Sequence, residues 1–280
     1  MKKILAIKTF GNHTNNLYQF TQLYCIAREN NLNLSYLQFY KIKKFYNINY
    51  SNKSNLTIDI FYRILHYIFN FLAKIKIIKI YNLSLPEKCN KFITDICNKR
   101  KILFFTTGWS HSNNPILYQG KDLEVKYKDE INSLFKNDCG EILKKYFPDK
   151  NKVTIGLHIR RGDYKYYKDG KYYYIDEVYQ NAVKSFTDNI NLKDFNIIIF
   201  TNDKDLDKEF YLKKFKNCFF SNEEFQIDYE LMKNCNYLIG PPSSFTMWAS
   251  YLGNVPLYHI KEKNQAVTRE CFKICDGFTS

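Results

Sequence analysis

Residues Val153–Tyr164 read V-T-I-G-L-H-I-R-R-G-D-Y, and this stretch decides the expected fold. Its apolar residues occupy every second position from Val153 to Ile159, which is the pattern of a β-strand. A histidine, two arginines, a glycine, an aspartate and a tyrosine come where the strand should end. Ligands bind outside the carboxyl ends of strands in open α/β sheets, and guanidinium groups match phosphate oxygens, so the stretch predicts an anion site. An arginine pair by itself would equally fit a solvated loop.

Strand-like and helical runs alternate along the chain. The strand-like runs cover residues 4–7, 34–39, 102–106, 153–159, 197–200, 218–220, 237–239 and 256–260. The helical runs cover residues 17–30, 58–80, 175–186, 206–215, 228–235 and 244–252. This alternation predicts an α/β fold with parallel sheets of Rossmann type. The polar stretch 147–152 is the best linker candidate, so we expect an N-terminal domain over 1–150 and a C-terminal domain over 151–280.

The 280-residue chain is long enough to bury a sizeable core, and its formal net charge is +14. Such a charge attracts nucleotides, nucleic acid and anionic membrane surfaces alike. The sequence has no RNA-recognition signature, zinc-finger spacing or basic zipper, so we expect no nucleic-acid partner. Part of the lysine excess also has a neutral explanation, because AT-rich codons would produce it.

Eight cysteines are scattered without C-x-x-C spacing, and no nearby histidine completes a metal set with Cys271 and Cys275. We therefore expect free thiols in the cytoplasm. The apolar run before Lys8 is too short for a secretory leader. Residues 58–80 are apolar but interrupted by charges, so they are not expected to span a membrane. We expect a core helix there, with a helix that lies on a bilayer as the alternative.

Two further polar clusters follow strand-like runs. Residues 197–203 read I-I-I-F-T-N-D, and Asp203 would either help to cap the next helix or accept hydrogen bonds from a guanine base. Gly240 and two prolines precede Ser243 and Ser244, which would present hydroxyl and backbone N–H groups at a helix start. That turn is either an ordinary N-cap or a phosphate site, and we favour phosphate because it accompanies the other two clusters.

The string His158-x-Arg160-Arg161-x-Asp163-Tyr164 resembles the first signature motif of the α-1,2- and α-1,6-fucosyltransferases, most closely that of the bacterial α-1,2 enzymes. The resemblance implies a GT-B architecture, in which two Rossmann-like domains face a central cleft. It also implies that the C-terminal domain binds GDP-fucose through His158, Arg160, Arg161 and Tyr164. The N-terminal domain would then hold the acceptor.

The later clusters also resemble this family. Its members place an aspartate after the second strand, which implies that Asp203 reads the guanine base. Residues 228–253 resemble the family's acidic-led helix, short strand and Ser-Ser-Phe turn. This implies that Ser243, Ser244 and Phe245 form a turn that binds the donor's phosphates, although we expect the Phe245 ring itself to pack in the core.

The N-terminal string 9–19, T-F-G-N-H-T-N-N-L-Y-Q, resembles the family's Gly-Leu-Gly-Asn-Gln turn, with fewer glycines and one added residue. The resemblance implies that Gly11, Asn12 and His13 contact the fucose or the acceptor. A plain loop between a strand and a helix fits these residues almost as well. Residues 40–150 match nothing in the family.

The resemblance implies a single-displacement, inverting transfer from GDP-β-L-fucose. Arg160 would stabilise the leaving diphosphate, and Asp163 would either remove the acceptor proton or buttress Arg160. Asp203, Asp205 and Asp207 lie at an expected helix start, so we interpret them as a charged face and expect no metal and no cofactor. The implied acceptor is a glycan hydroxyl, such as the 2-OH of a terminal galactose in an O-antigen or lipopolysaccharide at the inner membrane. The alternatives are a non-catalytic module that binds nucleotides or anionic glycans, and a transferase that uses another nucleotide sugar.

Overall fold

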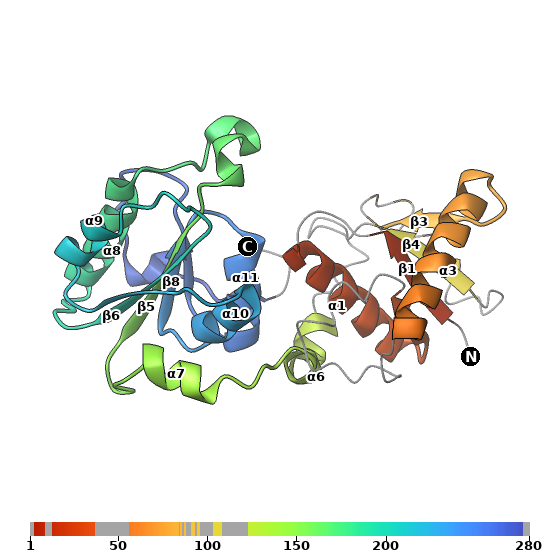
Figure 1. Ribbon diagram of the computed structural model, residues 1–280, viewed down its shortest axis with the longest axis horizontal. Helices are drawn as coiled ribbons and strands as arrows, with labels where there is room; N and C mark the ends of the chain where they lie inside the picture. The colour runs from red at the N-terminus through yellow and green to blue at the C-terminus, as the bar shows by residue number, and fades with distance from the viewer. Residues whose placement is uncertain are drawn as a thin grey trace. The chain divides into compact units, whose positions relative to one another are not determined.

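The computed structural model describes residues 3–8, 13–36, 56–83, 85, 87, 91–92, 94–95, 103–107 and 123–276. The chain divides into two compact units, Met1–Lys136 with Asp276–Thr279 and Asn137–Cys275 with Ser280 (Figure 1). Each unit contains a parallel sheet accompanied by helices, so the predicted α/β class is confirmed.

The boundary between the units lies at Lys136 and not at the predicted position 150. Helix α7 (Gly140–Tyr146) belongs to the second unit, because the buried Tyr146 hydroxyl donates to Glu223 Oε1 at 3.1 Å. The polar stretch 147–152 is a turn inside this unit, in which the Asp149 side chain accepts from the backbone N–H of Asn151 at 2.9 Å. A tight turn and a linker have the same polar composition, which explains the error.

The first unit is built on a sheet of four strands in the order β2-β1-β4-β3, with every pairing parallel. The strands are β1 (Lys3–Lys8), β2 (Asn33–Tyr36), β3 (Ile80–Asn82) and β4 (Leu103–Thr107), and the helices include α1 (His13–Glu29), α3 (Leu56–Lys74) and α6 (Lys128–Leu134).

Phe20 of α1 packs edge-on against Phe135, with ring centroids 5.7 Å apart. The Tyr24 hydroxyl donates to Glu130 of α6 at 2.7 Å, so α6 is held to α1. The sequence patterns predicted neither β3 nor α6.

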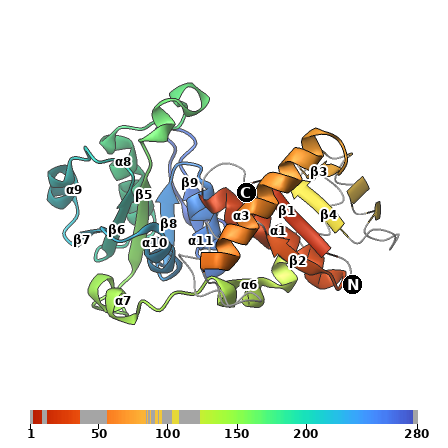
Figure 2. The ribbon, with the colours of Figure 1, turned by 45° about the vertical axis from the view of Figure 1, so that its right-hand side comes forward.

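Helix α3 differs from the core helix that we expected. It lies beside β1 (Figure 2), yet large apolar side chains such as Ile64, Tyr67 and Phe71 are exposed. The reason is that α3 carries apolar residues around most of its circumference, and only one side can face the sheet. Among the helices of the described ranges, none combines the length and apolarity that crossing a membrane requires.

The second unit contains a sheet of five parallel strands in the order β7-β6-β5-β8-β9. The strands are β5 (Thr154–Ile159), β6 (Asn196–Thr201), β7 (Cys218–Phe220), β8 (Tyr237–Gly240) and β9 (Leu257–His259). Besides α7, the helices are α8 (Asp176–Asn189), α9 (Lys208–Lys214), α10 (Phe225–Lys233) and α11 (Ser244–Gly253). Short 3₁₀ turns are η1 (Asp163–Lys165), η2 (Tyr167–Gly170) and η3 (Arg269–Cys271). All six cysteines in the described ranges are free thiols.

The strand order of the second unit reverses direction once. The chain steps from β5 to β6 and β7 on one side, and then continues with β8 and β9 on the other side. Right-handed crossovers therefore place α8 and α9 on one face and α10 and α11 on the opposite face (Figure 1). The carboxyl ends of β5 and β8 meet at the reversal, which is where open α/β sheets bind ligands.

Strand β5 is buried on both faces because it is the central strand between two helical layers. The alternation in its sequence therefore does not mark a solvent-facing side, and Thr154 and His158 are buried as well. Position 156 favours glycine, because an added Cβ would lie only 2.6 Å from Leu238 Cδ2.

Candidate functional site

Arg160 and Ser243 meet across the point where the strand order reverses. Arg160 follows β5 and Ser243 follows β8, and Arg160 Nη1 donates to Ser243 Oγ at 3.1 Å. Two of the predicted donor-binding residues, 83 positions apart in the chain, thus come together at the carboxyl edge of the sheet.

Asp163 and Tyr164 hold the Arg160 side chain in place. Arg160 Nε and Nη2 donate to the two carboxylate oxygens of Asp163 at 3.0 and 2.6 Å. The Tyr164 ring lies 4.7 Å from the guanidinium carbon, and its hydroxyl donates to the carbonyl of Pro242. These bonds use three of the five N–H donors that an arginine carries, and two remain for a ligand. The Arg160 guanidinium also holds the pKa of Asp163 below its usual range, which makes this carboxylate a weak base.

Arg161 points into a different set of contacts. Its Nε donates to the carbonyl of Tyr174 at 2.8 Å, and its Nη groups donate to Asp176 at 2.5 Å and to Asp203 at 3.2 Å. The arginine side chain is only 11 % exposed. Arg161 therefore joins the ends of β5 and β6 to the start of α8, and it does not contact Ser243 in this arrangement.

Asp203 is occupied by protein groups on both oxygens. One oxygen accepts from Arg161, and the other accepts from the backbone N–H of Asp205 at 3.0 Å. The alternative interpretation of Asp203 as the helix cap is wrong, because Asp207 caps α9 by accepting from the Phe210 N–H at 3.2 Å. The structure thus brings Asp203 to the carboxyl edge of the sheet as a partner of Arg161.

Asn202 connects the loop after β5 to the end of β6. Its Oδ1 accepts from the backbone N–H groups of Arg161 and Gly162 at 3.1 and 3.4 Å, and its Nδ2 donates to Asp163 at 3.4 Å. A Cβ on Gly162 would lie 2.9 Å from the Asn202 amide, so the glycine permits this approach. Asn202 stands in the second motif, but the sequence alone did not select it as a site residue.

His158 lies beneath the site in an aromatic stack. Its ring is 5.4 Å from the Phe245 ring, which lies 4.3 Å from that of Tyr229. Burial lowers the pKa of His158 to about 3, so the imidazole is neutral at physiological pH. Phe245 packs on both rings but is only half-buried, and its role at the donor's phosphates stays a prediction. His158 contributes a buried, neutral ring to this stack.

The turn before α11 has the predicted form of a helix N-terminus. Ser243 is the N-cap, and its Oγ accepts from the Phe245 N–H at 3.2 Å as well as from Arg160. Ser244 opens the helix directly after the cap. The positive end of the α11 dipole and its first backbone N–H groups therefore lie beside Arg160, an arrangement that attracts an anion.

Asp228 is a site candidate that the motif analysis did not select. It lies in the first turn of α10, and Ser221 Oγ donates to its Oδ1. Burial raises its pKa to about 7, and its Oδ2 accepts no hydrogen bond from the described residues. The next residue, Tyr229, belongs to the stack beneath the site. A half-buried carboxyl with a raised pKa is typical of functional sites, but only the structure reveals its partial burial.

The predicted acceptor-side residues belong to the first unit. Gly11 and Asn12 lie outside the described residues, and His13 is the first residue of α1 in the first unit. Their contacts with fucose or acceptor stay predictions. Within the described ranges, no group of three or more His, Cys, Asp or Glu side chains could hold a metal ion, and the metal independence of the reaction also stays a prediction.

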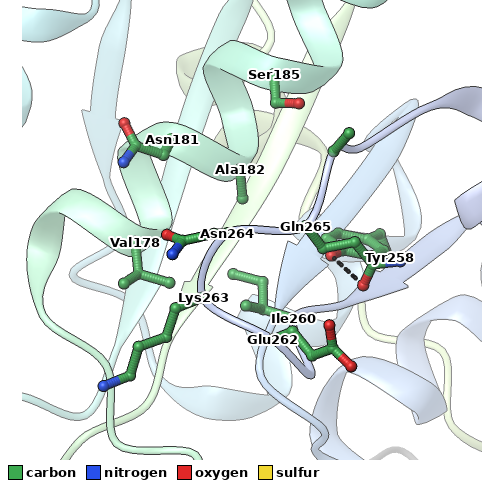
Figure 3. Close-up of a pocket in the computed structure, with 11 residues that line it drawn as sticks. Val178, Asn181, Ala182, Ser185, Tyr258, Ile260, Glu262, Lys263, Asn264 and Gln265 are labelled. Atoms are coloured by element: carbon green, nitrogen blue, oxygen red, sulfur yellow. Dashed lines mark hydrogen bonds between the residues drawn. The ribbon is translucent and has the colours of Figure 1, made fainter.

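A separate pocket of about 370 Å³ opens between α8 and the segment after β9 (Figure 3). Asn181 and Ser185 line it from α8, and Glu262 and Lys263 line it from the other side. None of the predicted donor-binding residues lines this pocket. It lies on the face of the sheet that α8 covers and is distinct from the cluster around Arg160.

A model of Glycosyl transferase family 11 matches residues 4–271 of the chain. No curated protein sequence matches this chain. A mutant of Arabidopsis thaliana FUT1 in complex with GDP has a TM-score of 0.59 at 12 % identity, and the match covers 94 % of this chain and 71 % of that one. Fucosyltransferase NodZ from Bradyrhizobium has a TM-score of 0.53 at 14 % identity, covering 95 % and 97 %. NodZ α-1,6-fucosyltransferase soaked with GDP-fucose has a TM-score of 0.54 at 12 % identity, covering 92 % and 95 %. At such identities the likeness concerns the fold, and it confirms the predicted GT-B type.

Proposed function

Because the chain belongs to glycosyl transferase family 11, we propose that it transfers L-fucose from GDP-β-L-fucose to a hydroxyl group of a glycan. The observation that carries the proposal is the contact between Arg160 and Ser243, which joins two of the fucosyltransferase-like motifs at the reversal of the strand order. The related folds that were crystallised with GDP or GDP-fucose support a guanine nucleotide as the donor.

The donor's diphosphate would lie between Arg160 and the N-terminus of α11. Arg160 keeps two N–H donors, and α11 adds the backbone N–H groups of its first turn and its dipole. As the bond between fucose C1 and the β-phosphate oxygen breaks, negative charge grows on that oxygen. Donors fixed in advance stabilise this charge, and such stabilisation usually contributes more to the rate than any other single effect. Positive charge from these groups also supports transfer without a metal or another cofactor.

The guanine base would be read by Asp228 and not by Asp203. Guanine presents two adjacent donors, its N1–H and its 2-amino group, and these require an acceptor-only carboxylate. Each Asp203 oxygen already accepts one bond, from Arg161 or from Asp205, whereas Asp228 Oδ2 accepts none from the described residues. Arg161 and Asp203 would instead hold the donor-binding loop in shape.

Arg160 would be the catalytic residue, and Asp163 its positioning residue. A base must attract the acceptor proton, but the ion pair with Arg160 lowers the proton affinity of Asp163. The acceptor oxygen attacks C1 while the diphosphate leaves from the opposite face, so the β-linked donor gives an α-fucoside. His158 would support the donor site through its stack with Phe245, and Tyr164 would support it by packing on Arg160.

The proposed linkage is α-1,2 to a terminal galactose of a glycan such as an O-antigen or lipopolysaccharide. The H-x-R-R-x-D-Y string supports this assignment, because it resembles that of bacterial α-1,2 enzymes most closely. We place the activity in the cytoplasm, at the inner face of the membrane, where a net charge of +14 favours contact with anionic lipids.

The test is release of GDP from GDP-fucose with lactose as acceptor, in the presence and absence of EDTA. We expect release that requires lactose and survives EDTA, and an Arg160→Ala protein that binds GDP but hardly turns over. Binding of GDP without transfer to any galactoside would point to a binding module. Tighter binding of UDP or CMP than of GDP, measured by calorimetry, would contradict the choice of donor.

A further inference from the structure

A loop rich in tyrosine and lysine lies directly beside Arg160. Residues Asp163–Tyr174 read D-Y-K-Y-Y-K-D-G-K-Y-Y-Y, and we call them the Tyr/Lys loop. The ring of Tyr164 contacts the Arg160 guanidinium, and the Tyr167 ring lies 5.2 Å from the Tyr164 ring. Tyr167 is 46 % exposed and its neighbour Tyr166 is 79 % exposed. The aromatic side chains thus continue from the candidate catalytic residue to the surface.

The Tyr/Lys loop is a built structure with both ends anchored. The buried Tyr164 is tied to the carbonyl of Pro242, and the buried Tyr174 hydroxyl donates to the carbonyl of Ile260 at 3.1 Å. Between these ends the backbone reverses through left-handed conformations at Lys168, Asp169 and Gly170. Such conformations are unfavourable for residues other than glycine, and they persist only where the surroundings impose them.

The chemistry of this surface suits a sugar that carries a negative charge. Tyrosine rings combine a flat apolar face with a hydroxyl, so they can pack on a pyranose and hydrogen-bond its edge. Lys165, Lys168 and Lys171 are exposed on the same loop, and Asp169 is the only acidic residue between them in the sequence. Lys168 Nζ lies 5.5 Å from the centre of the Tyr167 ring, so positive charge and ring surface occur together.

We propose that the exposed part of the Tyr/Lys loop, residues 165–173, is the acceptor site, and that it takes glycans bearing a carboxylate or phosphate. The proposal rests on the proposed fucosyl transfer, because it places the acceptor beside the fucose that Arg160 would help to release. It assigns the acceptor specificity to the second unit, whereas the sequence suggested the first.

Two galactosides test the proposal, one neutral and one with an open-chain carboxylate in place of the glucose ring. Lactobionate and lactose both end in galactose, but lactobionate carries a carboxylate. We expect a lower KM for lactobionate, by up to roughly fivefold, since one screened, exposed ion pair contributes only a modest attraction. Tyr166→Ala with Tyr167→Ala should raise both acceptor KM values and leave the KM of GDP-fucose unchanged. Replacing Lys165, Lys168 and Lys171 with Gln should remove only the preference for lactobionate.

Tyr67→Ala is the matched control, because Tyr67 is 74 % exposed but lies on α3. Unchanged acceptor KM values in the Tyr166/Tyr167 variant, or the same rise in the Tyr67 variant, would overturn the acceptor site alone. Absence of GDP binding by the wild-type protein would overturn the proposed function first, so the two failures are distinguishable.

A second inference rests on α3 alone. Large apolar side chains are exposed along one side of this helix and its C-terminal extension at Ile60, Ile64, Tyr67, Ile68, Phe71 and Ile75. Their spacing of three and four residues places them on one face, which we call the outer face of α3. Monomeric soluble proteins rarely expose an apolar stripe of this extent.

The end of this helix is positively charged. Lys74, Lys76 and Lys79 are exposed where α3 ends. An apolar stripe with lysines beside it matches the surface of a bilayer that contains anionic lipid. From this complementarity we infer that the outer face of α3 lies in the headgroup region of an anionic membrane.

Flotation with phosphatidylcholine vesicles, with and without phosphatidylglycerol, tests this inference. We expect the wild-type protein to float only with the anionic vesicles, and Ile64→Gln with Phe71→Gln to abolish flotation. Leu212→Gln is the control, since Leu212 is 47 % exposed on α9 and should not affect flotation. Equal flotation of the α3 variant would overturn the inference. The inference would also be overturned if the wild-type protein never floated and formed a dimer, detected by light scattering, that the α3 variant did not form.

Discussion

Arg160 Nη1 donates to Ser243 Oγ at 3.1 Å, and this contact joins the strand ends on the two sides of the topological reversal. Arg160→Lys keeps a positive charge but loses the planar fork of donors, so we expect kcat to fall by roughly 100- to 1000-fold. The fold should remain intact, because the side chain lies at the edge of the sheet. Initial-rate kinetics and the GDP affinity of the variant provide the measurement, and a kcat within threefold of wild type would contradict the catalytic role.

Asp163→Asn separates a positioning residue from a base. If Asp163 positions Arg160, kcat should fall while the rise of kcat/KM with pH on the acidic side persists. If Asp163 removed the acceptor proton, that acidic limb would disappear in the variant and kcat would fall by roughly 100- to 10,000-fold. We expect the first result, because the Arg160 guanidinium lowers the pKa of Asp163. A pH–rate profile of both proteins decides between the two.

Arg161→Ala should destabilise the second unit much more than most charge deletions. The variant leaves Asp176 and Asp203 without their shared cation in a largely buried position. Removing one partner of such a pair costs on the order of 3 kcal/mol. Urea unfolding, followed by circular dichroism, should show this loss, while Lys184→Ala, which breaks an exposed pair with Asp188, should change the midpoint little. Equal midpoints for the two variants would mean that the network adds no stability.

Gly240→Ala tests the close approach between β8 and β5. An added Cβ would lie 2.8 Å from the His158 carbonyl oxygen and 3.0 Å from His158 Cβ. Both atoms belong to a buried central strand that cannot move aside, so we expect a loss of about 1–3 kcal/mol in unfolding free energy. Activity should fall as well, because the shift reaches Arg160 and Ser243. Gly140→Ala is the control, since nothing lies within 4 Å of its added Cβ.

The neighbouring arginines show what sequence can and cannot predict. The motif correctly identified a strand end that gathers polar groups, because strand periodicity and charge are local properties. The roles of Arg160 and Arg161 could not be separated, because one contacts the end of β8 and the other contacts the end of β6. Which strand lies on which side of β5 depends on the sheet order, and that order depends on packing across the whole unit.

Helix α7 and Asp228 were missed for related reasons. The seven residues of α7 are too few for a clear helical period, and the buried Tyr146 that ties them to the second unit has its partners 74 and 77 positions away. Asp228 was visible as the acidic start of a helix, but its burial arises from tertiary packing. A raised pKa therefore has no signature in the linear sequence.

Asp228→Asn should increase stability and reduce GDP binding together. The pKa of Asp228 is raised to about 7 in the folded chain, so the folded state holds a proton that the unfolded state releases above about pH 4. Stability from this group is thus highest at low pH and declines as the pH rises through 7. The neutral amide escapes this loss, so the variant should unfold at a higher temperature than wild type at pH 8 and at a similar temperature near pH 4.

The affinity for GDP should fall in the Asp228→Asn variant, although its stability rises. The ionised carboxylate accepts from guanine N1–H and the 2-amino group, so the wild-type affinity for GDP should fall as the pH drops below 7. In the variant, the amide N–H₂ would face the 2-amino group of guanine, and the affinity for GDP should fall by tenfold or more. Xanthosine diphosphate carries a carbonyl at that position, so it should bind the variant better than GDP does. Calorimetric titration with both nucleotides measures this preference. A variant that is more stable but binds GDP normally would leave Asp228 as a half-buried structural carboxyl and return base recognition to Asp203.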